Sequence, residues 1–209
     1  MPDDATILEL DTPHGLARAH VQAPPGPPVA ALVLGHGAGG SITAPDLQAV
    51  AGAARAAGVT TVLVEQPYRV TGRRSAAPAR QLDAAWTAVI AQLRDGPLAG
   101  LPLLVGGRSA GARVACRTAE QVGAAGVLCL AFPLHPPRRS PEAEQKTRLP
   151  ELDAVRVPIL VVQGVTDPFG MPPHGPQRTV VEVEGNHSLK ADAGAVASAA
   201  AAWLDTVLR

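Results

Sequence analysis

Aromatic residues are scarce in this chain of 209 residues, which contains two Trp, one Tyr and two Phe. A core with so few rings must be built from smaller apolar side chains, here mainly Val, Leu and Ala. An excess of charge of either sign is also lacking, because 18 basic residues balance 18 acidic ones. This balance removes the electrostatic reason to expect nucleic acid or an anionic membrane as a partner.

Cysteines and long apolar runs are equally few. Cys116 and Cys129 have neither a CxxC pattern nor the spacing of a zinc site, so we interpret them as core thiols. No run of about 18 apolar residues is present to span a bilayer, and the first residues lack the pattern of a secretory signal. We therefore expect a cytoplasmic protein in which residues 1–209 form one domain. The oligomeric state is not defined by these features.

Short apolar runs alternate with Ala-rich helical stretches along the chain. This alternation predicts an α/β fold with a mostly parallel sheet of about eight strands and helices on both faces. The expected strands are 6–10, 16–22, 29–34, 59–64, 101–105, 126–131, 158–163 and 178–183. Helices are expected over 45–57, 79–94, 109–122 and 190–208, with a helical turn near 151–154.

Ser109 stands in a Gly-x-Ser-x-Gly pentapeptide between Gly107 and Gly111. A serine hydroxyl is a poor nucleophile unless a base takes its proton and the resulting oxyanion is stabilised. The pentapeptide presents such a serine on a tight strand-to-helix turn, where small flanking residues avoid clashes. Chance produces this pattern easily in a glycine-rich chain, but here an expected strand precedes it and an expected helix follows it. We therefore predict Ser109 as the nucleophile.

An acid and a base follow Ser109 in the order that this turn requires. Asp167 comes just after the apolar strand 158–163, and His187 comes after the last strand. The carboxyl ends of parallel strands share one edge of a sheet, so the three residues are expected to converge. We predict His187 as general base and Asp167 as the group that orients it. The histidines at 14, 20, 135 and 174 are interpreted as ordinary side chains.

The stabilisation of an oxyanion calls for two backbone donors. One is the N–H of Ala110, directly after the nucleophile, and the other is expected from the loop Gly35–Gly40 after the third strand. We assign the second donor to Ala38, with Gly37 and Gly39 as neighbouring alternatives.

The same loop supports a different function. Gly35, Gly37 and Gly40 satisfy G-x-G-x-x-G, and Glu65 ends the next strand where a ribose-binding acid is expected, so a dinucleotide-binding oxidoreductase is an alternative. This alternative leaves Ser109, Asp167 and His187 unexplained. A dinucleotide-binding fold also normally begins with its glycine-rich strand, whereas here two expected strands precede the G-x-G-x-x-G pattern. A non-catalytic, hydrolase-shaped interaction module is a further alternative.

With these motifs identified, the chain resembles the α/β-hydrolase superfamily, and within it the small dienelactone-hydrolase-like proteins of the branch with testis-expressed protein 30 and non-specific-lethal-complex subunit 3. The resemblance implies the predicted triad, with no metal and no cofactor. It does not imply lactone specificity, because dienelactone hydrolase proper has a cysteine nucleophile. The segments that carry the resemblance are 34–40, 106–113, 132–137, 163–170 and 185–188.

The substrate pocket is expected among the loops of the same edge. His36, Tyr68, Phe132 and Phe169 are the residues assigned to it. No sizeable insertion follows the sixth strand, which argues against a large lid and favours a small soluble ester, thioester or related acyl substrate. Arginines also occur in these loops, and they are either solvated charges or a site for a carboxylate on the substrate: Arg69, Arg73, Arg74, Arg138 and Arg139.

Overall fold

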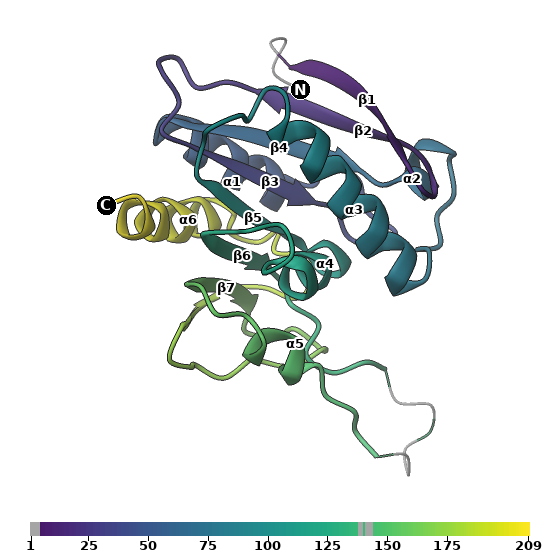
Figure 1. The fold of residues 1–209 in the computed structure, drawn as a ribbon. Coiled ribbons are helices and arrows are strands. Elements are labelled where there is room, and N and C mark those ends of the chain that lie inside the picture. The colour runs from purple at the N-terminus through teal and green to yellow at the C-terminus, as the bar shows by residue number, and fades with distance from the viewer. Residues whose placement is uncertain (1–4, 138–139, 141–143) are drawn as a thin grey trace.

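The computed structural model describes residues 5–137, 140 and 144–209. In these residues, eight strands form one sheet in the order β1-β2-β4-β3-β5-β6-β7-β8 (Figure 1). The strands are β1 (Thr6–Thr12), β2 (Gly15–Gln22), β3 (Ala30–Gly35), β4 (Val59–Glu65), β5 (Leu103–Arg108), β6 (Gly126–Leu130), β7 (Ile159–Gly164) and β8 (Arg178–Val183). The expected α/β fold is confirmed.

The strands run in parallel from β4 to β8 across the sheet, and β2 alone among the eight strands runs in the opposite direction. The carboxyl ends of the other seven strands therefore lie along one edge. The hairpin turn reaches that edge as well, because Arg18 of β2 pairs with Glu65 at the end of β4. This edge is where the predicted site residues were expected to meet.

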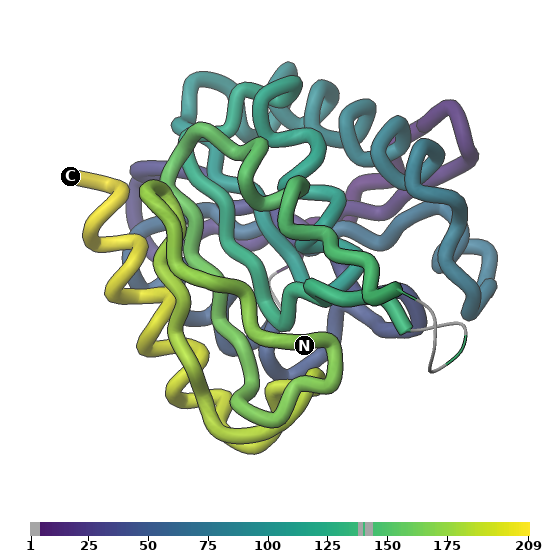
Figure 2. The backbone as a smooth tube through the Cα atoms, turned by 90° about the horizontal axis from the view of Figure 1, so that it is seen from below, coloured from purple at the N-terminus to yellow at the C-terminus, as the bar shows by residue number. Residues whose placement is uncertain are grey.

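Helices cover both faces of the sheet (Figures 1 and 2). Helices α3 and α4 pack on one face and α1 and α6 on the other. The helices are α1 (Pro45–Ala56), α2 (Pro67–Val70), α3 (Ala79–Arg94), α4 (Ala110–Thr118), α5 (Leu149–Asp153) and α6 (Ala193–Val207).

The central strands read as continuous apolar runs because both of their faces are buried. Alternate residues of β3 and β5 enter opposite layers: Val33 and Val105 pack toward α3 and α4, whereas Leu32 and Leu104 pack toward α1 and α6. The two cysteines belong to the first layer, where the Sγ atoms of Cys116 and Cys129 lie 3.5 Å apart and buried. Hydrogen bonding to Cys116 and burial raise the pKa of the Cys129 thiol, which stays protonated.

Three local details differ from the sequence prediction. Strand β5 starts at Leu103 and continues to Arg108, because glycine at 106 allows close pairing with β6; a Cβ there would collide with the Leu128 carbonyl oxygen. Helix α4 ends at Thr118 and is followed by turns. Helix α2, a single turn that starts at Pro67, was expected to be loop; proline suits the first turn of a helix.

Few elements cover the carboxyl edge. In the described part of the segment between β6 and β7, the only helix is the five-residue α5, so no helical lid is present there. None of the described helices is long and apolar enough to cross a membrane.

The layered core predicts the stability of one variant pair. Leu32 of β3 is fully buried at the centre of the sheet, so Leu32→Ala should lower the free energy of unfolding by about 3 kcal/mol through lost burial and a cavity. Ile7 of β1 is 53% exposed, and Ile7→Ala should change it by less than about 0.5 kcal/mol. Urea denaturation measures both, and equal losses would contradict the assignment of Leu32 to the core.

Candidate active site

Ser109 occupies a strained turn between β5 and α4. Its φ of 51° and ψ of −104° are unusual for a residue with a side chain, and such backbone strain costs about 1–3 kcal/mol. The N–H of Ser109 donates to the Leu130 carbonyl of β6 at 2.9 Å, which fixes the turn. A Cβ at Gly107 or at Gly111 would collide with the carbonyl oxygen of Gly35. The flanking glycines are therefore required by the close approach of β3.

The structure brings Ser109, His187 and Asp167 together. The Oγ of Ser109 lies 2.9 Å from Nε2 of His187, and Nδ1 of His187 lies 2.8 Å from Oδ2 of Asp167. The Asp167 carboxylate accepts a hydrogen bond from Nδ1 of His187. Nδ1 therefore carries a proton, and the unprotonated Nε2 faces the Ser109 hydroxyl. The aspartate side chain is 1% exposed and the imidazole is 20% exposed, which leaves the reactive end accessible to a substrate.

The Asp167 carboxylate is held by two further donors. The backbone N–H of Phe169 donates to Oδ1 at 2.9 Å, and Nε2 of Gln163 lies 2.9 Å from Oδ2. The Gln163 amide is buried, and it also lies within hydrogen-bond distance of the Phe132 and Gly170 carbonyl oxygens. These bonds hold the carboxylate in place beside His187.

The loops that carry Asp167 and His187 are joined to one another. The carbonyl oxygen of Gly185 accepts from the N–H and the hydroxyl of Thr166, at 3.0 and 2.9 Å. Leu189, two residues beyond His187, is fully buried in the layer under α1 and α6 and anchors the histidine loop. The Phe169 ring packs edge-on against the His187 imidazole, with centroids 4.5 Å apart. The imidazole is therefore restrained from three directions.

The loop after β3 lies beside Ser109. A Cβ on Gly37 would lie 3.7 Å from Cβ of Ser109, which places this loop within reach of a group bound to the serine. Among the described residues, the N–H groups of Ala38 and Ala110 have no hydrogen-bond acceptor. The Tyr68 hydroxyl donates to the Ala38 carbonyl at 2.8 Å and fixes the loop from outside.

His36 is buried and bonded through both ring nitrogens. Nδ1 lies 2.8 Å from the Gly37 carbonyl, and Nε2 accepts from the Gln66 N–H at 3.1 Å, so the ring is neutral with its proton on Nδ1. Burial lowers the pKa of His36, and the bond to Gly37 opposes this effect. Sequence reasoning assigned His36 to the substrate pocket; with 3% exposure and both nitrogens engaged, it joins the loops after β3 and β4 instead.

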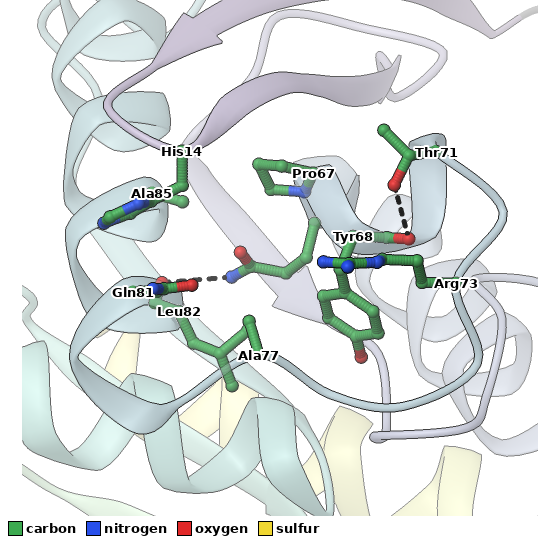
Figure 3. Close-up of a pocket in the computed structure, with 10 residues that line it drawn as sticks. His14, Pro67, Tyr68, Thr71, Arg73, Ala77, Gln81, Leu82 and Ala85 are labelled. Atoms are coloured by element: carbon green, nitrogen blue, oxygen red, sulfur yellow. Dashed lines mark hydrogen bonds between the residues drawn. The ribbon is translucent and has the colours of Figure 1, made fainter.

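The three aromatic residues assigned to the pocket occupy different environments. Phe132 is fully buried in the core and has no surface to offer a substrate, because the chain after β6 turns inward. Phe169 is half-buried against His187. Tyr68 lines a pocket of about 300 Å³ between the β1–β2 turn, α2 and the first turns of α3, together with apolar residues that include Pro67 and Leu82 (Figure 3).

The arginines of the loop after β4 also occupy different environments. Arg73 lines this pocket together with Tyr68 (Figure 3). Arg69 donates through Nη1 to the Arg73 carbonyl at 3.1 Å and so braces the loop. Arg74 lies next to the loop after β3, since a Cβ on Gly39 would lie 3.9 Å from its carbonyl oxygen. Arg138 and Arg139 lie outside the described residues.

Sequence reasoning missed two side chains near the site. Arg108 donates through Nη2 to the His187 carbonyl at 2.8 Å and pairs with the buried Asp46 of α1. Arg108 directly precedes Ser109, but nothing in the motif indicates where its side chain points. An acidic residue in a first helical turn, such as Asp46, is ordinarily read as a response to the helix dipole.

A strained serine turn at the carboxyl edge of such a sheet is the architecture of the α/β hydrolases. A profile of the family described as alpha/beta hydrolase domain matches residues 28–203, and the chain belongs to this family. No curated protein matches the chain.

Several solved structures share the fold. A lidless α/β serine hydrolase from Xanthomonas campestris is 21% identical, with a TM-score of 0.74 over 99% of this chain and 96% of that one. Est1E from Butyrivibrio proteoclasticus is 14% identical, with a TM-score of 0.77 over 96% and 98%. A dienelactone hydrolase from Anabaena variabilis is 18% identical, with a TM-score of 0.75 over 99% of each chain.

The burial of His36 predicts a pH-dependent contribution to stability. Its pKa in the folded protein lies below the unfolded value near 6.5, so the unfolded chain binds more protons in acid. The contribution of His36 is therefore complete above about pH 6.5 and is lost as the pH falls below that value. The stability difference between wild type and His36→Gln should shrink between pH 7 and pH 5 in urea titrations. His14→Gln, at an exposed position, serves as control; a difference independent of pH would contradict this assignment.

Proposed function

We propose that this protein is a serine hydrolase that acts on a small soluble ester, thioester or related acyl substrate through an acyl-enzyme. The observation that carries the proposal is the continuous line of hydrogen bonds from Ser109 Oγ through His187 to the buried Asp167 carboxylate. This line starts at a strained turn that exposes the hydroxyl at the open edge of the sheet.

Each group has a role in the reaction. His187 Nε2 takes the Ser109 proton as Oγ attacks the substrate carbonyl, and Asp167 stabilises the imidazolium and its tautomer. The N–H groups of Ala110 and Ala38 donate to the oxyanion. His187 then gives its proton to the leaving group, and the acyl group remains on Ser109. The same imidazole next activates a water molecule, which releases the acid and restores the serine.

The names of the structural neighbours support this proposal, since they include a serine hydrolase, an esterase domain and a dienelactone hydrolase. The five sequence segments identified above also lead us to place the chain in the branch of testis-expressed protein 30. The dinucleotide-binding alternative finds less support. The helix after the glycine-rich loop starts only at Pro45, and the Glu65 carboxylate lies 3.0 Å from the His20 ring. An interaction module without catalysis has no need for the complete hydrogen-bonded line.

A fluorophosphonate tests the proposed mechanism without knowledge of the substrate. It should react covalently with Ser109 in the wild-type protein, and mass spectrometry of the tryptic peptide locates the adduct. Ser109→Ala should show no adduct. Asp167→Asn should label more slowly, on the order of 10⁴-fold, because an amide no longer holds His187 in the tautomer that accepts the Ser109 proton.

Two results would overturn the proposal. Folded wild-type protein that does not label but binds a nicotinamide dinucleotide would support the oxidoreductase. Folded protein that does neither would support the interaction module. Circular dichroism before labelling establishes that the protein is folded.

We further infer that the pocket beside Tyr68 receives part of the substrate and that Arg73 favours a carboxylate there. Tyr68 connects this pocket to the proposed site: its ring lines the pocket, and its hydroxyl donates to the carbonyl of Ala38, whose N–H is the proposed oxyanion donor. Its wall combines apolar side chains with one guanidinium that has no ion-pair partner among the described residues. A short acyl chain with a terminal carboxylate matches this lining.

Substrate charge tests the role of Arg73. The wild type should hydrolyse a p-nitrophenyl ester with a terminal carboxylate faster than the neutral ester of equal chain length. Arg73→Gln should reduce that preference by about tenfold, corresponding to one solvent-screened charge-assisted bond. Arg55→Gln, at the end of α1 on the opposite edge, removes the same charge as a control. Equal rates for the two esters in the wild type would exclude the carboxylate preference.

A further inference from the structure

Arg108 joins three segments that carry or border the site. Its Nη2 donates to the backbone carbonyl of His187 at 2.8 Å. Its Nε lies 2.9 Å from Oδ2 of Asp46 as an ion pair, without the straight N–H···O alignment of a hydrogen bond. A Cβ on Gly37 would lie 3.0 Å from Nη1, so the guanidinium also packs against the loop after β3.

The anchor of this guanidinium is rigid. The Asp46 side chain is fully buried in the first turn of α1, and its Oδ1 accepts from the Leu47 N–H at 3.0 Å. Burial raises the pKa of Asp46, and the charge of Arg108 opposes that effect. A buried carboxylate of this kind holds a planar guanidinium in one orientation. The Arg108 side chain is itself only 16% exposed.

The partner of Arg108 in the histidine loop is a backbone atom, so the bond acts on the position of the loop rather than on the charge of the ring. The carbonyl that it holds belongs to the same residue whose Nε2 meets Ser109 at 2.9 Å. Arg108 also directly precedes Ser109 at the end of β5. The Arg108 side chain therefore connects the loop of His187 to the turn that carries Ser109.

We propose that Arg108, held by Asp46, is a positioning residue that sets the distance between His187 and Ser109. The proposal rests on the serine-hydrolase function proposed above. A change of about 1 Å in the placement of a reacting group is enough to lower a rate by about a hundredfold. Loss of the guanidinium should therefore slow the activation of Ser109 while the binding of substrate changes little.

The test compares Arg108→Gln with a matched control, Arg117→Gln. Arg117 of α4 is 20% exposed and pairs with Asp83 and Glu151, so its loss also breaks partly buried ion pairs but touches none of the site residues. We expect the rate constant of fluorophosphonate labelling to fall tenfold to a hundredfold in Arg108→Gln and to stay within about twofold in Arg117→Gln. With a p-nitrophenyl ester, the loss should appear in kcat and not in KM.

A spectroscopic readout separates this proposal from the proposed function. The proton shared by His187 Nδ1 and Asp167 should give a low-field resonance in proton NMR of the wild type, which should be absent from His187→Gln. It should weaken or vanish in Arg108→Gln as the histidine loop shifts, and it should persist in Arg117→Gln. A wild type that shows the resonance but does not label would overturn the hydrolase function alone.

Arg108→Lys covers the case in which Arg108→Gln does not fold. An ammonium group keeps the charge opposite Asp46 but does not reach Asp46 and the His187 carbonyl together, because it lacks the guanidinium fork. It should fold and label at least fivefold more slowly than the wild type. Labelling and resonance at wild-type levels in any folded Arg108 variant would overturn the positioning role.

Discussion

The packing of backbone against backbone at Gly35 is the constraint on which the site depends. The carbonyl oxygen of this residue occupies the space where Gly107 and Gly111 would carry side chains. Because neither has one, the end of β3 and the serine turn come into direct contact, and the loop that follows β3 reaches Ser109. The strained conformation of Ser109 is stable because β6 and β3 hold the turn from both sides.

The remaining groups are arranged so that few parts can move separately. The loops with Asp167 and His187 follow neighbouring strands, and Thr166 of the first donates two bonds to the Gly185 carbonyl of the second, so the two loops are joined. The loop after β3 is joined to the segment after β4 by the hydrogen bonds of Tyr68 and His36. Arg108 contacts both groups of loops, since it donates to the His187 carbonyl and packs against Gly37. The site is thus preorganised by backbone carbonyls that accept bonds from side chains.

The fold and the proximity of three residues that are distant in the sequence could be predicted from the sequence, because both follow from the apolar periodicity and the order of the elements along the chain. Apolar runs fix the strands, and parallel strands bring their carboxyl ends to one edge, which places Asp167 and His187 near Ser109. The pocket was harder to predict. Phe132 follows a strand just as Tyr68 does, but whether a ring turns toward the core or toward the edge is decided by tertiary packing. The direction of the Arg108 side chain was unpredictable for the same reason.

The scarcity of aromatic residues has an optical consequence. The two tryptophans of the chain belong to different layers: Trp86 of α3 packs on one face of the sheet, and Trp203 of α6 packs on the other. Both indoles are shielded from water, and the ring of Trp86 lies against Gly35 at the serine turn. Replacing one indole leaves a single tryptophan, in the opposite layer. Intrinsic fluorescence is thereby a native reporter of whether the two halves of the core melt together or one after the other.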